Sequence, residues 1–125
     1  MAYLAVALGG AFGAISRYWI STNVESLNSS EFPLGTFTVN VIGSLLIGVL
    51  FVFFAEKAVL SEVYRQFLVV GLLGAMTTFS TFSLDTLLLF QQGHYNTALF
   101  YVLGSVALCL MSALLGMQLT RAILC

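Results

Sequence analysis

Charged side chains are scarce in this chain. Only four Lys or Arg and five Asp or Glu occur among its 125 residues, which is 7% of the sequence, and the mean hydropathy is +1.05. A soluble protein normally carries about 25% charged residues, so the composition predicts a membrane protein. The net charge of -1 and the lack of any Lys/Arg cluster argue against nucleic-acid binding and against a polybasic lipid-binding surface.

Residues suited to catalysis, metal binding or cross-linking are also few. The two cysteines, Cys109 and Cys125, have no metal or redox spacing, and we interpret them as free thiols. The apolar segments hold no Cys/His cluster, nucleophile–base pair, phosphate-binding loop or paired carboxylates. We therefore expect no enzymatic activity.

Four apolar segments make up most of the chain. They cover roughly residues 3–22, 34–55, 67–90 and 97–123, and each is near or above the roughly 20 residues that span a bilayer as a helix. The connections are too short for a soluble domain. We predict an all-α membrane protein with four transmembrane helices in a single integral membrane domain, residues 1–125. No positively charged stretch or small-residue cleavage site precedes the first segment, so we expect that segment to be retained.

The orientation signal is weak. Lys57, Arg65 and Arg121 fall on the side that holds both termini, whereas at most Arg17 falls on the other. This excess favours both termini in the cytoplasm, yet a bias of about two charges is small. Insertion both ways up is therefore plausible, and an antiparallel homodimer with dual topology and a two-fold axis in the membrane plane is one expected outcome. A second copy would also complete a pore that so small a bundle cannot build alone.

Residues 74–83 of the third segment carry much of the polarity. Five of the seven residues 77–83 bear a hydroxyl, although an unpaired polar group in hydrocarbon is costly. Gly74 lacks a Cβ, and helix-breaking residues at membrane depth are tolerated where the freed backbone is buried in protein or lines a water-filled cavity. The sequence predicts a broken or strained third helix that lines a path for something small and polar.

Polar and small residues form one face in each of two other segments. The face of the second segment comprises Thr36, Asn40, Gly43, Ser44 and Gly48, and that of the fourth comprises Tyr101, Ser105, Cys109, Ser112 and Gly116. For Asn40, an interhelical hydrogen bond and the lining of a pore both remain open. For the fourth segment, a packing seam and a polar track remain open.

Several further residues allow both a structural and a functional interpretation. Arg17 either extends to the lipid headgroups or places positive charge beside a pathway. Phe79 and Phe82 share a helix face and, taken alone, are typical of a core. Gly9 and Gly13 have the small-xxx-small spacing of a close helix interface.

The polar groups inside the spans are mainly neutral hydrogen-bond donors, accompanied by phenyl rings. Hydroxyls and an amide can donate to an anion, and the positive edge of a phenyl ring can face one. Because there is no ring of carboxylates for cations, this environment suits a small anion stripped of water better than a metal ion. Hydroxyls also accept hydrogen bonds, so a path for a neutral solute remains open.

Three motifs resemble those of the Fluc/CrcB fluoride channels. They are Gly9-Gly-x-x-Gly-Ala-x-x-Arg17-Tyr, Gly35-Thr-x-x-Val-Asn40-x-x-Gly-Ser44 and Gly71-x-x-Gly-x-x-Thr-Thr-Phe-Ser-Thr-Phe82-Ser. The resemblance implies a passive, selective channel in the cell inner membrane that exports fluoride from the cytoplasm and relieves its toxicity. It also implies an antiparallel homodimer with two fluoride pathways.

The resemblance further implies roles for individual residues. Phe79 and Phe82 would form aromatic boxes along the pathways, Asn40 would donate to fluoride, and Arg17 would lie near the vestibule. Hydroxyls expected along the polar track are those of Ser80, Thr81, Tyr101, Ser105 and Ser112. Backbone carbonyls of Gly74 and Thr77, from both subunits, would hold a structural Na⁺ at the dimer axis. The chain departs from the family pattern at Ala75-Met76 and at Cys109.

Two other classes fit the size and composition. A small multidrug-resistance-like exporter has four helices and dual topology, but it needs a membrane-embedded glutamate in its first helix, and residues 1–23 contain none. A structural or regulatory membrane protein would use the small-residue faces for packing alone, and the absence of ion flux from the purified protein would favour it.

Overall fold

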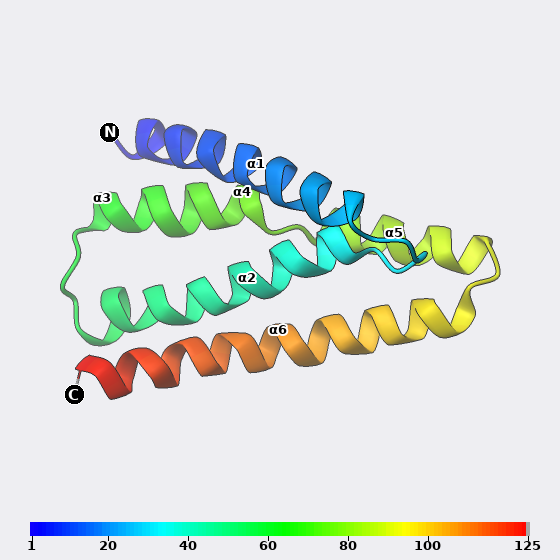
Figure 1. Ribbon diagram of the computed structural model, residues 1–125. Helices are drawn as coiled ribbons and strands as arrows, with labels where there is room; N and C mark the ends of the chain where they lie inside the picture. Colours follow the sequence, from blue (N-terminus) through cyan, green and yellow to red (C-terminus); the bar gives the residue numbers. More distant parts are fainter. Residues whose placement is uncertain (125) are drawn as a thin grey trace.

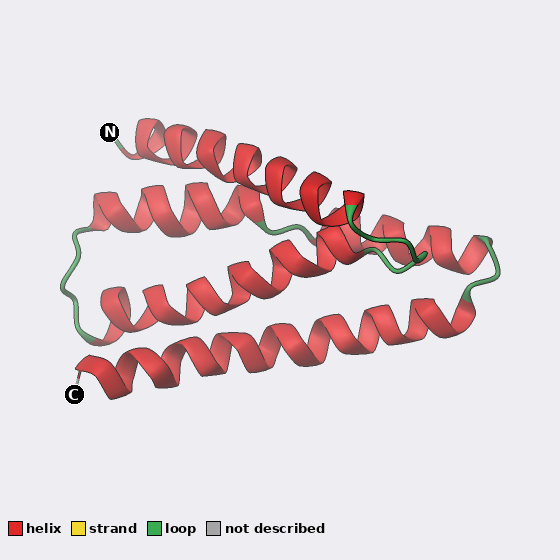
Figure 2. Ribbon diagram, in the orientation of Figure 1, coloured by secondary structure: helices red, strands yellow, loops and turns green. Residues whose placement is uncertain are grey.

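The computed structural model describes residues 1–124, which fold into helices joined by short loops (Figures 1 and 2). Some of these helices end in or contain wider π-helical turns, labelled η. In chain order the elements are α1 (Ala2–Ser26), α2 (Leu34–Phe51), η1 (Val52–Glu56), α3 (Glu62–Arg65), η2 (Gln66–Leu73), α4 (Gly74–Met76), α5 (Phe79–Gln91) and α6 (Tyr95–Leu124). Within the described residues the fold is thus all-α, as the sequence predicts.

Consecutive helical elements join into longer rods. Three rods are long and apolar enough to cross a membrane: Leu34–Glu56 (α2 and η1), Glu62–Gln91 (α3 to α5, called the third rod below) and Tyr95–Leu124 (α6). The α1 helix is long as well, with 25 residues, but Arg17 and its polar C-terminal end make it less apolar. It runs past the end of the expected segment because Thr22 and Asn23 bond back to main-chain carbonyls one turn earlier, at 2.6 and 2.7 Å. Such bonds satisfy polar side chains within the helix itself.

Large apolar side chains cover the outside of the bundle. Phe100 is 70% exposed, Leu110 68% and Phe12 58%, whereas fully buried side chains are few. A soluble domain would bury such groups. The outward apolar surface agrees with a bundle whose solvent is lipid.

Glycines allow the helices to approach backbone to backbone. Figure 1 shows α1 beside the rod that contains η2, and a Cβ added to Gly9 or Gly13 would overlap a carbonyl oxygen of Phe67 or Leu72 in that rod. The small-residue spacing of Gly9 and Gly13 predicts such an interface, because only a residue without a Cβ permits it. The contact between α2 and α6 is built in the same way: Gly48 lies against the carbonyl of Ala113.

The third rod is interrupted between α4 and α5, about halfway along the bundle (Figure 2). Thr77 has ψ 157° and Thr78 has φ −152° and ψ 123°, so both are extended. Gly74, the helix-breaking residue expected from the sequence, has helical angles (φ −59°, ψ −36°) and lies inside the preceding helix. That attribution is wrong: the break falls on two β-branched residues, whose side chains suit extended backbone.

Candidate functional site

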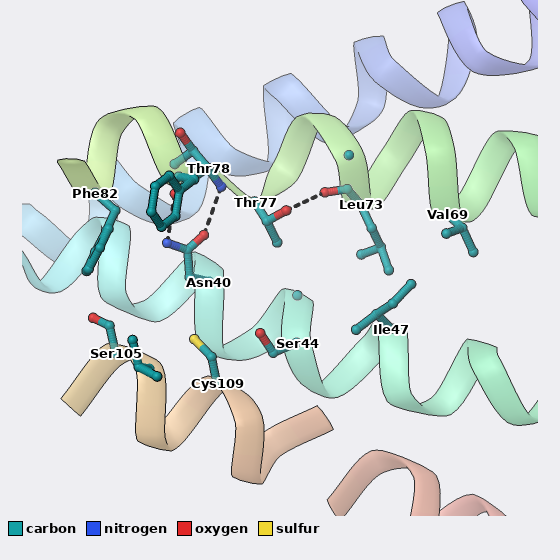
Figure 3. Close-up of a pocket in the computed structure, with 14 residues that line it drawn as sticks. Asn40, Ser44, Ile47, Val69, Leu73, Thr77, Thr78, Phe82, Ser105 and Cys109 are labelled. Atoms are coloured by element: carbon teal, nitrogen blue, oxygen red, sulfur yellow. Dashed lines mark hydrogen bonds between the residues drawn. The ribbon is translucent and has the colours of Figure 1, made fainter. Parts of the chain in front are cut away.

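The break is held open by a side chain from α2. Asn40 Nδ2 donates to the carbonyl of Thr78 at 3.0 Å, and the Thr78 amide donates to Asn40 Oδ1 at 2.8 Å (Figure 3). The side-chain amide thus pairs with both main-chain polar groups of Thr78, as a neighbouring strand would. Asn40 is therefore an interhelical hydrogen-bonding residue, and its second Nδ2–H is left for another acceptor.

Thr78 also begins the helix that follows. It is buried, with 8% of its surface exposed, and its Oγ1 accepts a hydrogen bond from the Thr81 amide at 3.1 Å, which caps α5. The same oxygen is 3.2 Å from Ser80 Oγ. This role of Thr78 is not among the sequence-based predictions, although a Thr just before a helix start is a typical capping signal.

Thr77 is fixed on the opposite side of the break. Its hydroxyl donates to the Leu73 carbonyl at 2.9 Å, and its methyl group lies where a Cβ of Gly43 would be. The glycine of α2 thereby makes the notch into which the Thr77 side chain fits. Since each threonine of the break contacts α2, that helix determines the local backbone.

Aromatic rings form a row from the exposed start of α5 to a buried tyrosine of α6. The ring centroids of Phe79 and Phe82 are 5.4 Å apart, and those of Phe82 and Tyr101 are 5.0 Å apart. Phe79 is 78% exposed, whereas Tyr101 is completely buried and donates its hydroxyl to Asp85 Oδ2 at 3.0 Å. Asp85 is thus paired with a buried tyrosine, a contact that is not among the sequence-based predictions.

A pocket of about 420 Å³ lies between α2, α6 and the broken rod, next to the break (Figure 3). Its wall is mostly apolar, with a few hydrogen-bonding groups. The predicted site residues that it brings together are Asn40, Gly74, Thr77, Phe79, Phe82 and Ser105. Cys109 joins them from α6.

The other predicted residues lie outside this pocket. Arg17 and Thr81 line a second pocket of about 340 Å³, together with Thr78. Tyr101 is buried against Asp85, and Ser112 lies half-buried two turns beyond Ser105 on α6. Ser80 is exposed in the first turn of α5 and lines neither pocket. The structure therefore separates the predicted set into a central pocket, a pocket next to Arg17, and positions outside both pockets.

Within residues 1–124, no group of three or more His, Cys, Asp or Glu side chains could hold a metal ion. A cation at the break would therefore be held by neutral oxygens, such as main-chain carbonyls. The Gly74 carbonyl is suited to this, since the Thr78 amide, which would bond to it in a continuous helix, donates to Asn40.

Comparison with known proteins assigns the chain to a family. Residues 4–117 match the family model described as "CrcB-like protein, Camphor Resistance (CrcB)". A protein of Saccharophagus degradans is 46% identical over 119 residues, which cover 95% of this chain and 89% of the relative. A Magnetococcus marinus protein is 47% identical, covering 94% and 96%, and a Hahella chejuensis protein is 48% identical, covering 95% and 94%. All three carry the name "Fluoride-specific ion channel FluC". The family match includes every residue that lines the two pockets, and on this evidence the chain belongs to the CrcB family.

Proposed function

We propose that this protein is a passive channel that conducts fluoride selectively across the cell inner membrane and so lets it leave the cytoplasm. The observation that carries the proposal is the identity of 46–48% over more than nine-tenths of the chain to relatives named fluoride-specific ion channels. Because these relatives are named as channels, we expect transport without catalysis.

The chemistry of the break supports an anion as the permeating species. The α5 helix starts inside the bundle, where its first N–H groups and the positive end of its dipole favour negative charge. The second Nδ2–H of Asn40 adds a neutral donor, and Phe79 and Phe82 add ring edges. These groups replace water around an anion without the strong binding that a fixed positive charge would impose.

Four spans and a second copy complete the proposed architecture. The α1 helix, packed through Gly9 and Gly13 against η2, would serve as the fourth span, with residues 1–125 as one membrane domain. Phe79 is 78% exposed although it lines the central pocket, which leaves that pocket open on one side. A second copy would cover this side, and the weak charge bias favours the antiparallel arrangement with two fluoride pathways.

The antiparallel homodimer can be tested in cells. In a chain whose two cysteines are replaced, Ser29→Cys lies in the loop before α2, at the end of the bundle opposite the termini. A membrane-impermeant thiol reagent should label half of the molecules from outside the cell, and cross-linking should give the mass of two chains. Complete or absent labelling would refute dual topology.

Main-chain carbonyls at the break fit a structural Na⁺. The Gly74 carbonyl has lost its helical donor to Asn40, and Gly74 is itself exposed, so that a second copy could supply matching oxygens. Gly74 and Thr77 of both chains would hold the ion, which would supply only a positive charge that joins the chains. We expect the purified dimer to melt at a higher temperature in sodium than in a large organic cation, and equal melting temperatures would contradict the site.

Ion efflux from liposomes tests the main proposal. Vesicles that contain the purified protein are loaded with potassium fluoride or potassium chloride, and a potassium ionophore is added so that charge stays balanced. Rapid fluoride efflux without chloride efflux is the expected result. The Gly104→Ala variant is a matched control, since a Cβ at Gly104 would meet nothing within 4 Å.

Two outcomes would contradict a selective channel. Chloride efflux as fast as fluoride efflux would show a pore without selectivity. The absence of both, from protein that cross-linking shows to be dimeric, would favour a structural role for the family fold in this chain.

A further inference from the structure

Ser105 has a buried hydroxyl without a partner. Only 6% of the residue is exposed, and among residues 1–124 its Oγ is the one buried side-chain oxygen or nitrogen that makes no hydrogen bond. Other hydroxyls in these helices, those of Thr38, Ser83, Thr86 and Thr120, donate to the carbonyl four residues earlier. Because Ser105 lines the central pocket, its free hydroxyl indicates a ligand or reacting group in that pocket.

A thiol lies one helical turn away on the same side of α6. Cys109 is half-buried, forms no disulfide and lines the same pocket. Figure 3 shows its sulfur directed from α6 toward Asn40 on α2. Asn40, which holds both main-chain groups of Thr78, lines the same pocket as this thiol.

We propose that Cys109, together with Ser105, is a modification site at which small uncharged thiol-directed electrophiles of the alkylmercury class react and close the channel. The closing effect rests on the proposed function, whereas the reaction itself does not. An uncharged reagent suits the site because much of the pocket wall consists of apolar groups, including Ile47, Val69 and Leu73.

The reaction with methylmercury chloride balances without an oxidant. The sulfur–mercury bond forms, the S–H and Hg–Cl bonds break, and a proton and a chloride ion leave. Sulfur binds a soft metal as the thiolate, so the thiol proton leaves as the sulfur–mercury bond forms. The Ser105 hydroxyl has no hydrogen-bond partner in the structure and lies one helical turn from Cys109, so we expect it to turn and donate to the sulfur as the proton leaves.

Two single-cysteine chains make the test specific. Cys125→Ser leaves Cys109 as the only thiol, and Cys109→Ser leaves only Cys125, which lies outside the described residues. Each protein is reconstituted in liposomes and treated with methylmercury chloride. The mass of the intact protein gives the number of adducts, and fluoride efflux is compared with that of the same untreated variant.

We expect Cys125→Ser to gain one methylmercury adduct and to lose fluoride efflux at least tenfold, whereas Cys109→Ser keeps its own untreated rate. Adding Ser105→Ala to the Cys125→Ser chain should slow formation of the adduct several-fold. Adding Ser83→Ala should not, because the Ser83 hydroxyl bonds to the carbonyl of Phe79.

Two results would overturn the proposal: an adduct at Cys109 with unchanged efflux, or a Cys109 that reacts only after denaturation in detergent. If the untreated protein conducts no fluoride, the proposed function fails on its own. The adduct mass and its dependence on Ser105 then still decide whether this thiol is a modification site.

Discussion

Replacing Asn40 should both destabilise the bundle and impair fluoride flux. In Asn40→Ala, the Thr78 amide and carbonyl lose bonds of 2.8 and 3.0 Å. Each such bond contributes about 0.5–1.5 kcal/mol net, and a buried group left without a partner costs about 1–3 kcal/mol. Since Thr78 is 8% exposed, little water reaches either group, and two such groups give a total loss of about 2–6 kcal/mol.

Asn40→Asp separates the hydrogen-bonding role from simple loss of the side chain. The aspartate keeps an oxygen for the Thr78 amide, but its second oxygen faces the Thr78 carbonyl, which previously accepted from Nδ2. Two acceptors then oppose each other, and a negative charge stands beside the pocket. We expect this variant to assemble, to melt at a lower temperature than the wild type, and to block fluoride.

The assay combines melting of the purified protein with fluoride efflux from liposomes. Ser44→Ala is the matched control, since Ser44 lies one turn further along α2 and lines the same pocket. An Asn40→Ala variant that melted like the wild type would refute this prediction, because the extended backbone at Thr78 would then not depend on the pair of hydrogen bonds to Asn40, which we call the Asn40–Thr78 clamp. Retained fluoride selectivity in Asn40→Asp would count against Asn40 as a donor to the ion.

Three further predictions concern other parts of the chain. Phe79→Ile or Phe82→Ile should abolish fluoride efflux while cross-linking still shows the dimer, and wild-type flux in either variant would remove the rings from the pathway. Gly9→Ala should lower stability by about 1–3 kcal/mol through overpacking, whereas Gly104→Ala, with open space around it, should not; equal melting temperatures would contradict the close helix contact. A main-chain hydrogen bond is the largest factor that lowers the pKa of Glu31 below its usual 4.5, so the carboxylate stabilises the protein above pH 4.5 and this effect is lost as the pH falls through the lowered pKa. The difference in melting temperature between wild type and Glu31→Gln should therefore shrink in acid, and a constant difference would exclude this linkage.

The helical segments could be predicted from the sequence because a helix that faces lipid is recognised by its length and apolar composition, without knowledge of specific contacts. The small-residue spacing of Gly9 and Gly13 predicts a helix interface, and the structure shows one with η2. The position of the break could not be predicted in the same way. It depends on Thr78 and Asn40, which are 38 residues apart in the chain, whereas local reasoning favoured Gly74.

In the candidate site, too, some features follow from the sequence and others depend on tertiary packing. Asn40, Phe82 and Ser105 line one pocket, although the sequence alone leaves open whether the polar helix faces are packing seams or line a path. The sequence left two uses of Asn40 open, and the structure shows the interhelical bond, while donation to an ion stays a prediction. The pairing of Tyr101 with Asp85 could not be predicted, because it depends on how α5 and α6 pack.

The clamp between Asn40 and Thr78 also bears on how the protein is made. An extended stretch whose amide and carbonyl lack partners is disfavoured in hydrocarbon. The third rod therefore cannot insert into the bilayer with its break at Thr78 unless α2 is beside it. Because α2 precedes this rod in the chain, ribosomal synthesis delivers the side chain that satisfies Thr78 before Thr78 itself emerges. The order of the segments thus lets the nascent chain insert an interrupted helix beside a neighbour that is already present.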